Sequence, residues 1–142
     1  MRLPAAVIVH GRSDIDRVLA HGRPVTLLSA PGAGIYGGCL WWRALVGSIR
    51  DARPGPEIRA VLDCADASGQ ALAAIRTGLD GLVLYLDAPG RERVAVIAAN
   101  RGILLLDRAP PALDMGSPGA QRRLDAWLQE RAAAGDSCGS LR

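Results

Sequence analysis

Short apolar runs alternate with amphipathic helical patterns along almost the whole chain, and this alternation constrains the fold more than any other feature. The apolar runs are rich in valine, leucine and isoleucine, which is typical of buried strands. They occupy residues 5–10, 24–29, 58–63, 82–86 and 103–107. Apolar residues recur at helical spacing in the segments that follow, residues 13–21, 36–52, 68–77, 89–100 and 118–131. A strand followed by a helix is therefore repeated five times.

Near-continuous apolar strands joined by helices indicate a parallel sheet covered on both faces. The sequence predicts a single three-layer α/β/α domain over residues 1–131, with a mainly parallel five-stranded sheet of the Rossmann-like, doubly wound type. An incomplete barrel that a partner chain completes is the alternative, because five units are too few for an eight-stranded barrel. The small and polar residues 132–142 predict a disordered tail.

Arginine provides all 17 of the residues that are either lysine or arginine, and the net charge is +3. The absence of lysine excludes the usual P-loop nucleotide site and Schiff-base chemistry. The arginines are scattered, so we expect no nucleic-acid partner, and their abundance, with that of alanine and glycine, is typical of a GC-rich genome. No run approaches the roughly 18–20 apolar residues that span a bilayer, and we expect a cytoplasmic protein with no membrane partner.

A glycine-rich turn follows the second predicted strand and contains Gly32-x-Gly34-x-x-Gly37. The spacing matches a dinucleotide-binding fingerprint, in which glycines and free amides at a helix start hold a phosphate. The expected acidic residue about 20 positions later is not clearly present, so no cofactor is identified. The turn therefore predicts either close packing of strand and helix or a site for an anionic or phosphorylated small molecule, with Ser29 and Tyr36 as hydrogen-bond donors.

Several polar residues follow predicted strands, where ligands bind in parallel sheets. His10 follows the first strand and Asp63 and Asp66 follow the third, so these three are candidates for general acid–base chemistry. Asp63 and Asp66, joined by Asp87 or Asp107, suit Mg²⁺ if they converge, but capping and turn formation explain the same residues, and we assign no metal site. A triad of Ser29, His10 and Asp63 is a further hypothesis, although it lacks the usual nucleophile elbow.

Cysteine and tryptophan give weaker signals. The three cysteines, Cys39, Cys64 and Cys138, are odd in number and widely spaced, so we predict neither a disulfide framework nor a zinc site. Trp41 and Trp42 are adjacent and should point about 100° apart on a helix. One of them can enter the core, while the other either reaches a second layer of the core or lies at the interface of a homodimer.

Two segments, VTLLSAPGAGIYGGCLWWRALV (residues 25–46) and VLDCADASGQALAAIRTGLDGLVL (residues 61–84), resemble a group of short bacterial α/β proteins of unknown function from GC-rich genomes. The resemblance implies one compact domain and a bacterial cytoplasm, and it implies no activity. Three hypotheses remain. They are a domain that binds an anionic small molecule, an enzyme using His10 or Asp63 as a base, and a structural or partner-binding subunit of a homo-oligomer.

Overall fold

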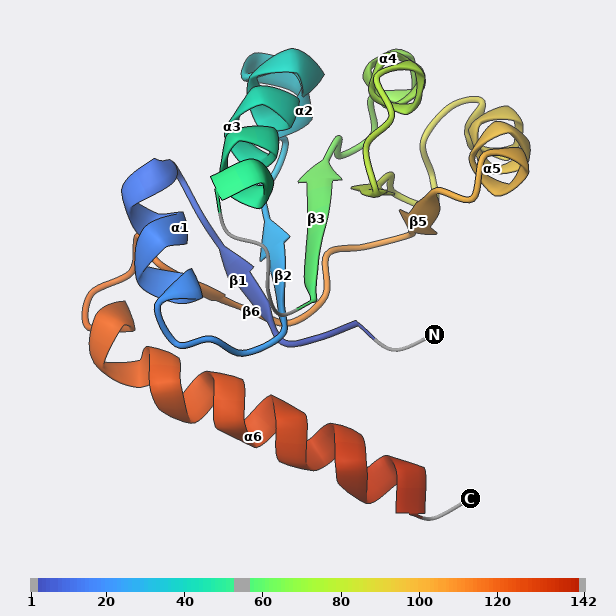
Figure 1. Ribbon diagram of the computed structural model, residues 1–142. Coiled ribbons are helices and arrows are strands. Elements are labelled where there is room, and N and C mark those ends of the chain that lie inside the picture. The colour runs from blue at the N-terminus through green and yellow to red at the C-terminus, as the bar shows by residue number, and fades with distance from the viewer. Residues whose placement is uncertain (1–2, 53–56, 141–142) are drawn as a thin grey trace.

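The computed structural model describes residues 3–52 and 57–140, with the side chains of 51–52 and 132–140 left out of the description. Its centre is a sheet of six strands, every neighbouring pair parallel, in the order β5-β4-β3-β2-β1-β6 (Figure 1). The strands are β1 (Ala6–Ile8), β2 (Val25–Leu28), β3 (Ile58–Asp63), β4 (Gly81–Val83), β5 (Leu104–Leu106) and β6 (Ala112–Asp114).

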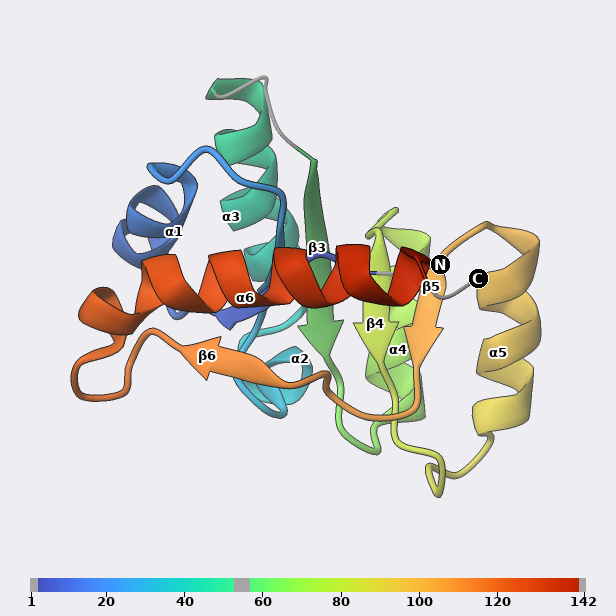
Figure 2. The same ribbon diagram turned by 90° about the horizontal axis from the view of Figure 1, so that it is seen from below.

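Helices cover both faces of this sheet, as a doubly wound α/β fold requires. They are α1 (Arg12–Leu19), α2 (Ala33–Tyr36), α3 (Cys39–Ala52), α4 (Ser68–Arg76), α5 (Arg91–Asn100) and α6 (Ala120–Ser140). The first five lie along one face, and α6 crosses the opposite face (Figures 1 and 2). No helix in the part of the chain described combines the length and hydrophobicity needed to span a membrane.

The predicted α/β class and all five predicted strands are confirmed, but the sequence analysis missed the sixth strand. Residues 112–114 read as loop because they are only three residues long and follow Pro110 and Pro111. They form a strand because β1 offers an open edge, to which Ala112–Asp114 pairs in parallel with Ala6–Ile8. A short edge strand has no distinctive local sequence pattern, because its stability comes from pairing with a strand that is distant in the sequence.

Helix boundaries differ from the prediction in two places. The predicted helix over 36–52 is α3 and begins at Cys39, because Gly38 takes a left-handed conformation (φ +82°) just before it, and the short helix α2 lies in the glycine-rich segment that was predicted as a turn. Helix α1 begins at Arg12, one residue before the predicted start at residue 13, and its N-cap is Gly11. The backbone of α6 continues to Ser140, while residues 141–142 lie outside the description, and the disordered tail stays a prediction.

The direction in which the sheet is wound reverses at β1. Strands β2 to β5 are added successively on one side of β1, and β6 is added on its other side. In open α/β sheets, ligands bind outside the carboxyl ends of the strands at such a reversal. The carboxyl ends of β1 and β6 are therefore where the fold alone places a site.

Candidate functional site

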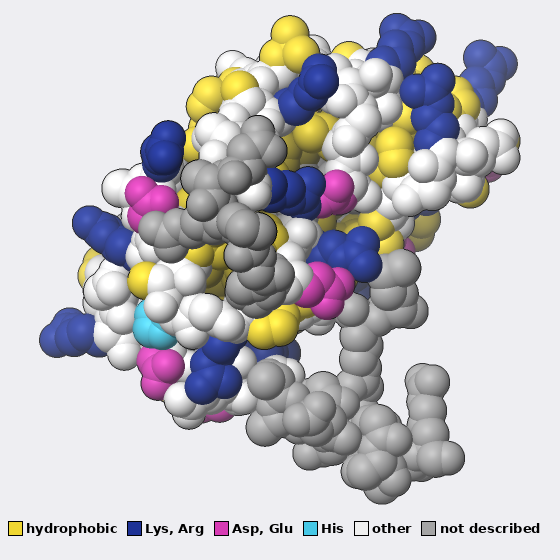
Figure 3. Space-filling view, viewed as in Figure 1, with side chains coloured by type: hydrophobic (Ala, Val, Ile, Leu, Met, Phe, Trp, Pro, Cys, Tyr) yellow, Lys and Arg dark blue, Asp and Glu magenta, His cyan; other side chains and the backbone are white. Residues whose placement is uncertain are grey.

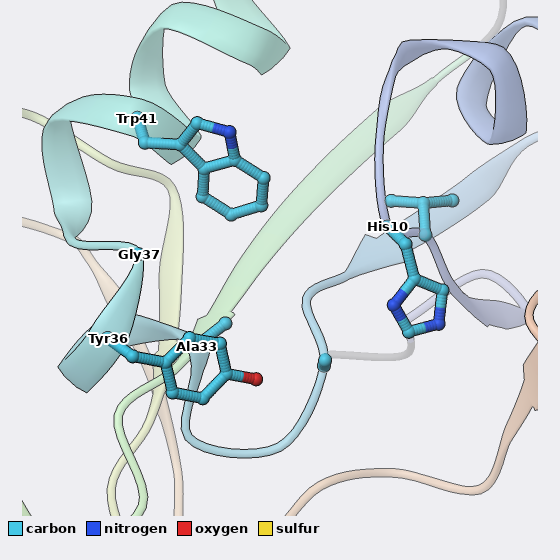
Figure 4. A pocket seen from close by; sticks show the side chains of 7 residues that line it. His10, Ala33, Tyr36, Gly37 and Trp41 are labelled. Carbon is cyan, nitrogen blue, oxygen red and sulfur yellow. The ribbon is translucent and has the colours of Figure 1, made fainter.

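A cavity of about 340 Å³ opens at the carboxyl edge of the sheet, beside the ends of β1 and β2 (Figure 4). Seven residues line it, and they are Val9, His10, Ala30, Ala33, Tyr36, Gly37 and Trp41. Its size lies at the lower end of the range of small-molecule sites, roughly 300–1,000 Å³. The lining is mostly apolar and aromatic, with one imidazole, which is the usual composition of a pocket for a small organic molecule.

Tyr36 and Trp41 form the aromatic wall of this cavity, and His10 lies across from them (Figure 4). Trp41 is 41% exposed and Tyr36 is 72% exposed, whereas the adjacent Trp42 is fully buried in the core. The two tryptophans therefore point apart, as their helical spacing predicted. Gly37 permits this arrangement, because a Cβ there would lie 3.1 Å from a carbon of the Trp41 ring and 3.1 Å from the carbonyl oxygen of Ala33.

His10 forms the polar side of the cavity through a pairing that sequence analysis did not find. Its Nε2 lies 2.6 Å from Oδ1 of Asp114, which ends β6 as His10 follows β1. The main-chain amide of His10 donates to Asp14 at 2.9 Å and so fixes the start of the β1–α1 connection. Only recognition of the sixth strand could have paired His10 with Asp114, since 104 residues separate them.

The surroundings of Asp114 favour its charged form. Burial acts to raise the pKa of its carboxyl group, but hydrogen bonds from His10 and from the Gly116 amide (2.8 Å), with the charge of His10, outweigh burial and lower that pKa. Gly116 also leaves room for the pair, because a Cβ there would come within 3.0 Å of His10 Nε2. Asp114 is therefore an ionised partner that accepts a hydrogen bond from Nε2–H of His10.

The amides of the glycine turn are largely engaged inside the fold. The Gly32 amide donates to Oδ1 of Asp63 (3.3 Å), and the Gly37 and Gly38 amides both donate to the carbonyl oxygen of Ala33 (2.8 and 3.2 Å). Gly34 is buried because α2 packs closely on β3, and a Cβ there would lie 2.8 Å from Cys64 Sγ. The turn thus has the packing role that the sequence analysis gave as one of its two explanations.

Ser29 and Asp63 are buried beneath the turn and bind main-chain groups. Ser29 Oγ accepts from the Asp63 amide (2.9 Å) and donates to the carbonyl oxygen of Ala30 (3.2 Å). The Asp63 carboxylate accepts from the Ala65 amide at 2.9 Å as well as from Gly32. The hypothetical triad is wrong, because His10 is paired with Asp114 and the Ser29 hydroxyl is bonded to main chain.

The remaining acidic candidates do not form a metal site in the described residues. No group of three or more histidine, cysteine or acidic side chains there is arranged to hold a metal ion. Asp66 is exposed and Asp63 is buried. Cys64 is also buried, and burial, followed by the charge of Asp63, raises the pKa of its thiol to about 12, so it is a poor nucleophile at neutral pH.

A second cavity, also of about 340 Å³, lies at the opposite edge of the sheet, where α4 and α5 end and β4 and β5 begin. It is lined by Arg76, Arg101, Asp80 and five apolar or glycine residues. The Asp80 carboxylate is already paired with Arg50, whose other contact is the carbonyl oxygen of Ile58 (2.9 Å). This second cavity lies away from β1, where the winding of the sheet reverses.

The arginines on the face shown in Figure 3 are spread over that face and do not form one basic patch.

No protein-family model matches the chain, and no curated protein matches it in sequence. The resemblance to short bacterial α/β proteins therefore stays an expectation.

Proposed function

We propose that this protein binds a small organic molecule with a flat apolar part in the cavity between the Tyr36–Trp41 wall and His10. The observation that carries the proposal is the position of this cavity. An accessible tryptophan, a tyrosine and a histidine line it at the carboxyl ends of β1 and β2, beside the reversal of winding.

The chemistry of the lining favours an uncharged or weakly acidic ligand over a phosphorylated one. None of the seven lining residues is an arginine, and the amides of three glycines of the turn, Gly32, Gly37 and Gly38, are bonded to Asp63 or Ala33. Tyr36 and Trp41 offer flat faces, on which planar rings stack with about 0.5–1.5 kcal/mol beyond the burial of area. The anionic ligand expected from the glycine pattern would gain charge complementarity here only from a protonated His10.

Ligand-detected NMR with a panel of single-ring aromatic compounds tests the proposal, with inorganic phosphate as the comparison. We expect Trp41→Ala to weaken binding of the aromatic compounds about tenfold, because the loss of one aromatic contact is worth about 1–2 kcal/mol. Trp41→Phe keeps an aromatic wall and should retain most of the affinity. Val96→Ala, which alters a residue 61% exposed on α5, is the matched control and should change nothing. Equal binding by all four proteins would contradict the proposal.

Association of two copies is the second candidate function, and one observation favours it. Ile35, Tyr36, Leu40 and Trp41 are all exposed on α2 and the start of α3, with Leu40 65% exposed. Exposed apolar groups of this kind are typical of interaction surfaces. Sedimentation analysis over a range of concentrations distinguishes the two functions, since Leu40→Ser would weaken a dimer while leaving the cavity lining intact.

A further inference from the structure

The hydrogen-bond partner of His10 determines which of its nitrogens is free to meet a ligand. An ionised carboxylate only accepts hydrogen bonds, so Nε2 beside Asp114 carries the proton of the neutral ring. The other nitrogen, Nδ1, then carries a lone pair. Figure 4 shows one ring nitrogen of His10 on the side of Tyr36 and Trp41, and the other turned away from them. Since Nε2 is held by Asp114, the nitrogen that faces the cavity is Nδ1.

No other group in the described residues satisfies this nitrogen. The Tyr36 hydroxyl, on the other side of the cavity, donates to the carbonyl oxygen of Pro31 (3.1 Å). The carboxylate of Asp14, on α1, accepts a hydrogen bond from the main-chain amide of His10 and lies 4.0 Å from Arg17. The cavity therefore presents one hydrogen-bond acceptor among apolar and aromatic surfaces.

We propose that the cavity takes a phenol-class ligand, a planar aromatic ring bearing an acidic hydroxyl group, whose O–H donates to Nδ1 of His10. This inference rests on the proposed function and specifies the ligand. The ring would lie against Tyr36 and Trp41, and the hydroxyl would reach His10. For a sufficiently acidic phenol, the proton passes from the ligand oxygen to Nδ1, which leaves a phenolate and an imidazolium ion. Asp114 then balances the positive charge at Nε2.

Asp114 and Gly116 act through His10, and both are positioning residues. Asp114 holds the proton on Nε2 and thereby keeps Nδ1 as the acceptor. The Gly116 amide donates to the same carboxylate oxygen, and its missing side chain leaves space for the imidazole. A merely structural role for Asp114 would leave the proton distribution of the ring unchanged when it is replaced.

The test compares 4-nitrophenol with 4-nitroanisole, which has the same ring but no acidic proton. Binding is followed by NMR in neutral buffer, where an ordinary imidazole is mostly uncharged. Ionisation is followed by the visible absorbance of the nitrophenolate ion, measured as the increase over the same concentration of 4-nitrophenol without protein. We expect 4-nitrophenol to bind about tenfold more tightly than 4-nitroanisole, with nitrophenolate absorbance growing as the protein is added. His10→Ala should abolish both the preference and the absorbance while the anisole still binds. His21→Ala, which replaces the other histidine, is the control.

Asp114→Asn adds a readout specific to the positioning role. The ¹⁵N chemical shifts of the His10 ring should show Nε2–H in the wild-type protein and a mixture of tautomers in the variant, with a smaller preference for the phenol. Equal binding of both compounds without nitrophenolate absorbance would overturn this inference and leave the proposed function standing. Absence of binding by both compounds would overturn the proposed function as well.

Discussion

The glycine turn and the His10 corner lie side by side at one edge of the same sheet, yet their polar groups are used in opposite ways. Around the turn, Ser29 and Asp63 are buried and bind main-chain groups. At the corner, His10 and Asp114 are about two-fifths exposed and form a side-chain pair with one imidazole nitrogen facing a cavity. The glycine pattern therefore indicated a region where the chain packs closely. The candidate ligand site depends instead on the pairing of His10 with Asp114, which join the ends of two strands far apart in the sequence.

The largest expected effect is on stability, at the turn. Asp63→Ala would leave the half-buried amides of Gly32 and Ala65 without an acceptor, and Ala65 holds a left-handed conformation (φ +50°) that this contact supports. We expect a loss of about 3 kcal/mol in the free energy of unfolding, measured by urea denaturation. Retained stability would show that the turn does not depend on Asp63, and it would contradict the claim that the polar groups around the turn serve to hold the fold together.

Gly34→Ala should cost about 2 kcal/mol, because its Cβ would press on Cys64 and on the backbone of β3. Gly47→Ala is the matched control, since Gly47 lies inside α3 with nothing within 4 Å of an added Cβ. That change should instead stabilise the protein by about 0.5–1 kcal/mol through helix propensity. If the two variants behaved alike in denaturation, close packing would not explain Gly34.

At the His10 corner the expected effect on stability is smaller and depends on pH. The folded state lowers the pKa of Asp114, so its pairing stabilises the protein above the ordinary carboxyl range and loses that contribution as the pH falls through the lowered pKa. The difference in unfolding free energy between the wild type and Asp114→Asn should stay below about 1 kcal/mol, because the pair is exposed. It should shrink on acidification, and a difference independent of pH would contradict the pairing.

The smallest expected effect concerns Cys64, which lies under the turn. A thiol whose pKa is raised to about 12 by burial should not react with an aromatic disulfide reagent at neutral pH in the folded protein. Mass spectrometry after labelling should find Cys64 modified only in denaturant. Rapid modification without denaturant would mean that the turn opens readily and is less rigid than its hydrogen bonds indicate.

The sequence predicted those parts of the fold that produce a local pattern of apolar and polar residues. Apolar runs and helical spacing indicated five strands and the alternating order. The adjacent residues Trp41 and Trp42 were expected to point apart with one of them in the core, and Trp42 is the buried one. The strand Ala112–Asp114 was not predictable, because three residues after two prolines form a strand only through pairing with β1. Since Asp114 belongs to that strand, its pairing with His10 could not be predicted either.

The candidate site was predictable in its location and only partly in its residues. His10, Tyr36 and Gly37 were expected at the carboxyl edge, and all three line the cavity. Trp41 was expected only as a packing or interface residue. Ser29, Gly32, Gly34 and Asp63 were candidates for a ligand site, with close packing as the alternative for the turn, and their contacts in the structure lie within and beneath the turn. Whether a polar group faces a ligand or the main chain depends on burial, which sequence spacing does not report.

The central claim is that the cavity beside His10, and not the glycine turn or the cleft at the opposite edge, receives a ligand. The most direct test is a map of backbone amide chemical shifts in ¹H–¹⁵N NMR spectra during titration with 4-nitrophenol. The account predicts the largest shifts at His10 and Trp41, which line the cavity outside the glycine turn, and smaller shifts at Gly32 and Gly34. Shifts concentrated instead at Arg76 and Arg101, or at no site, would contradict it.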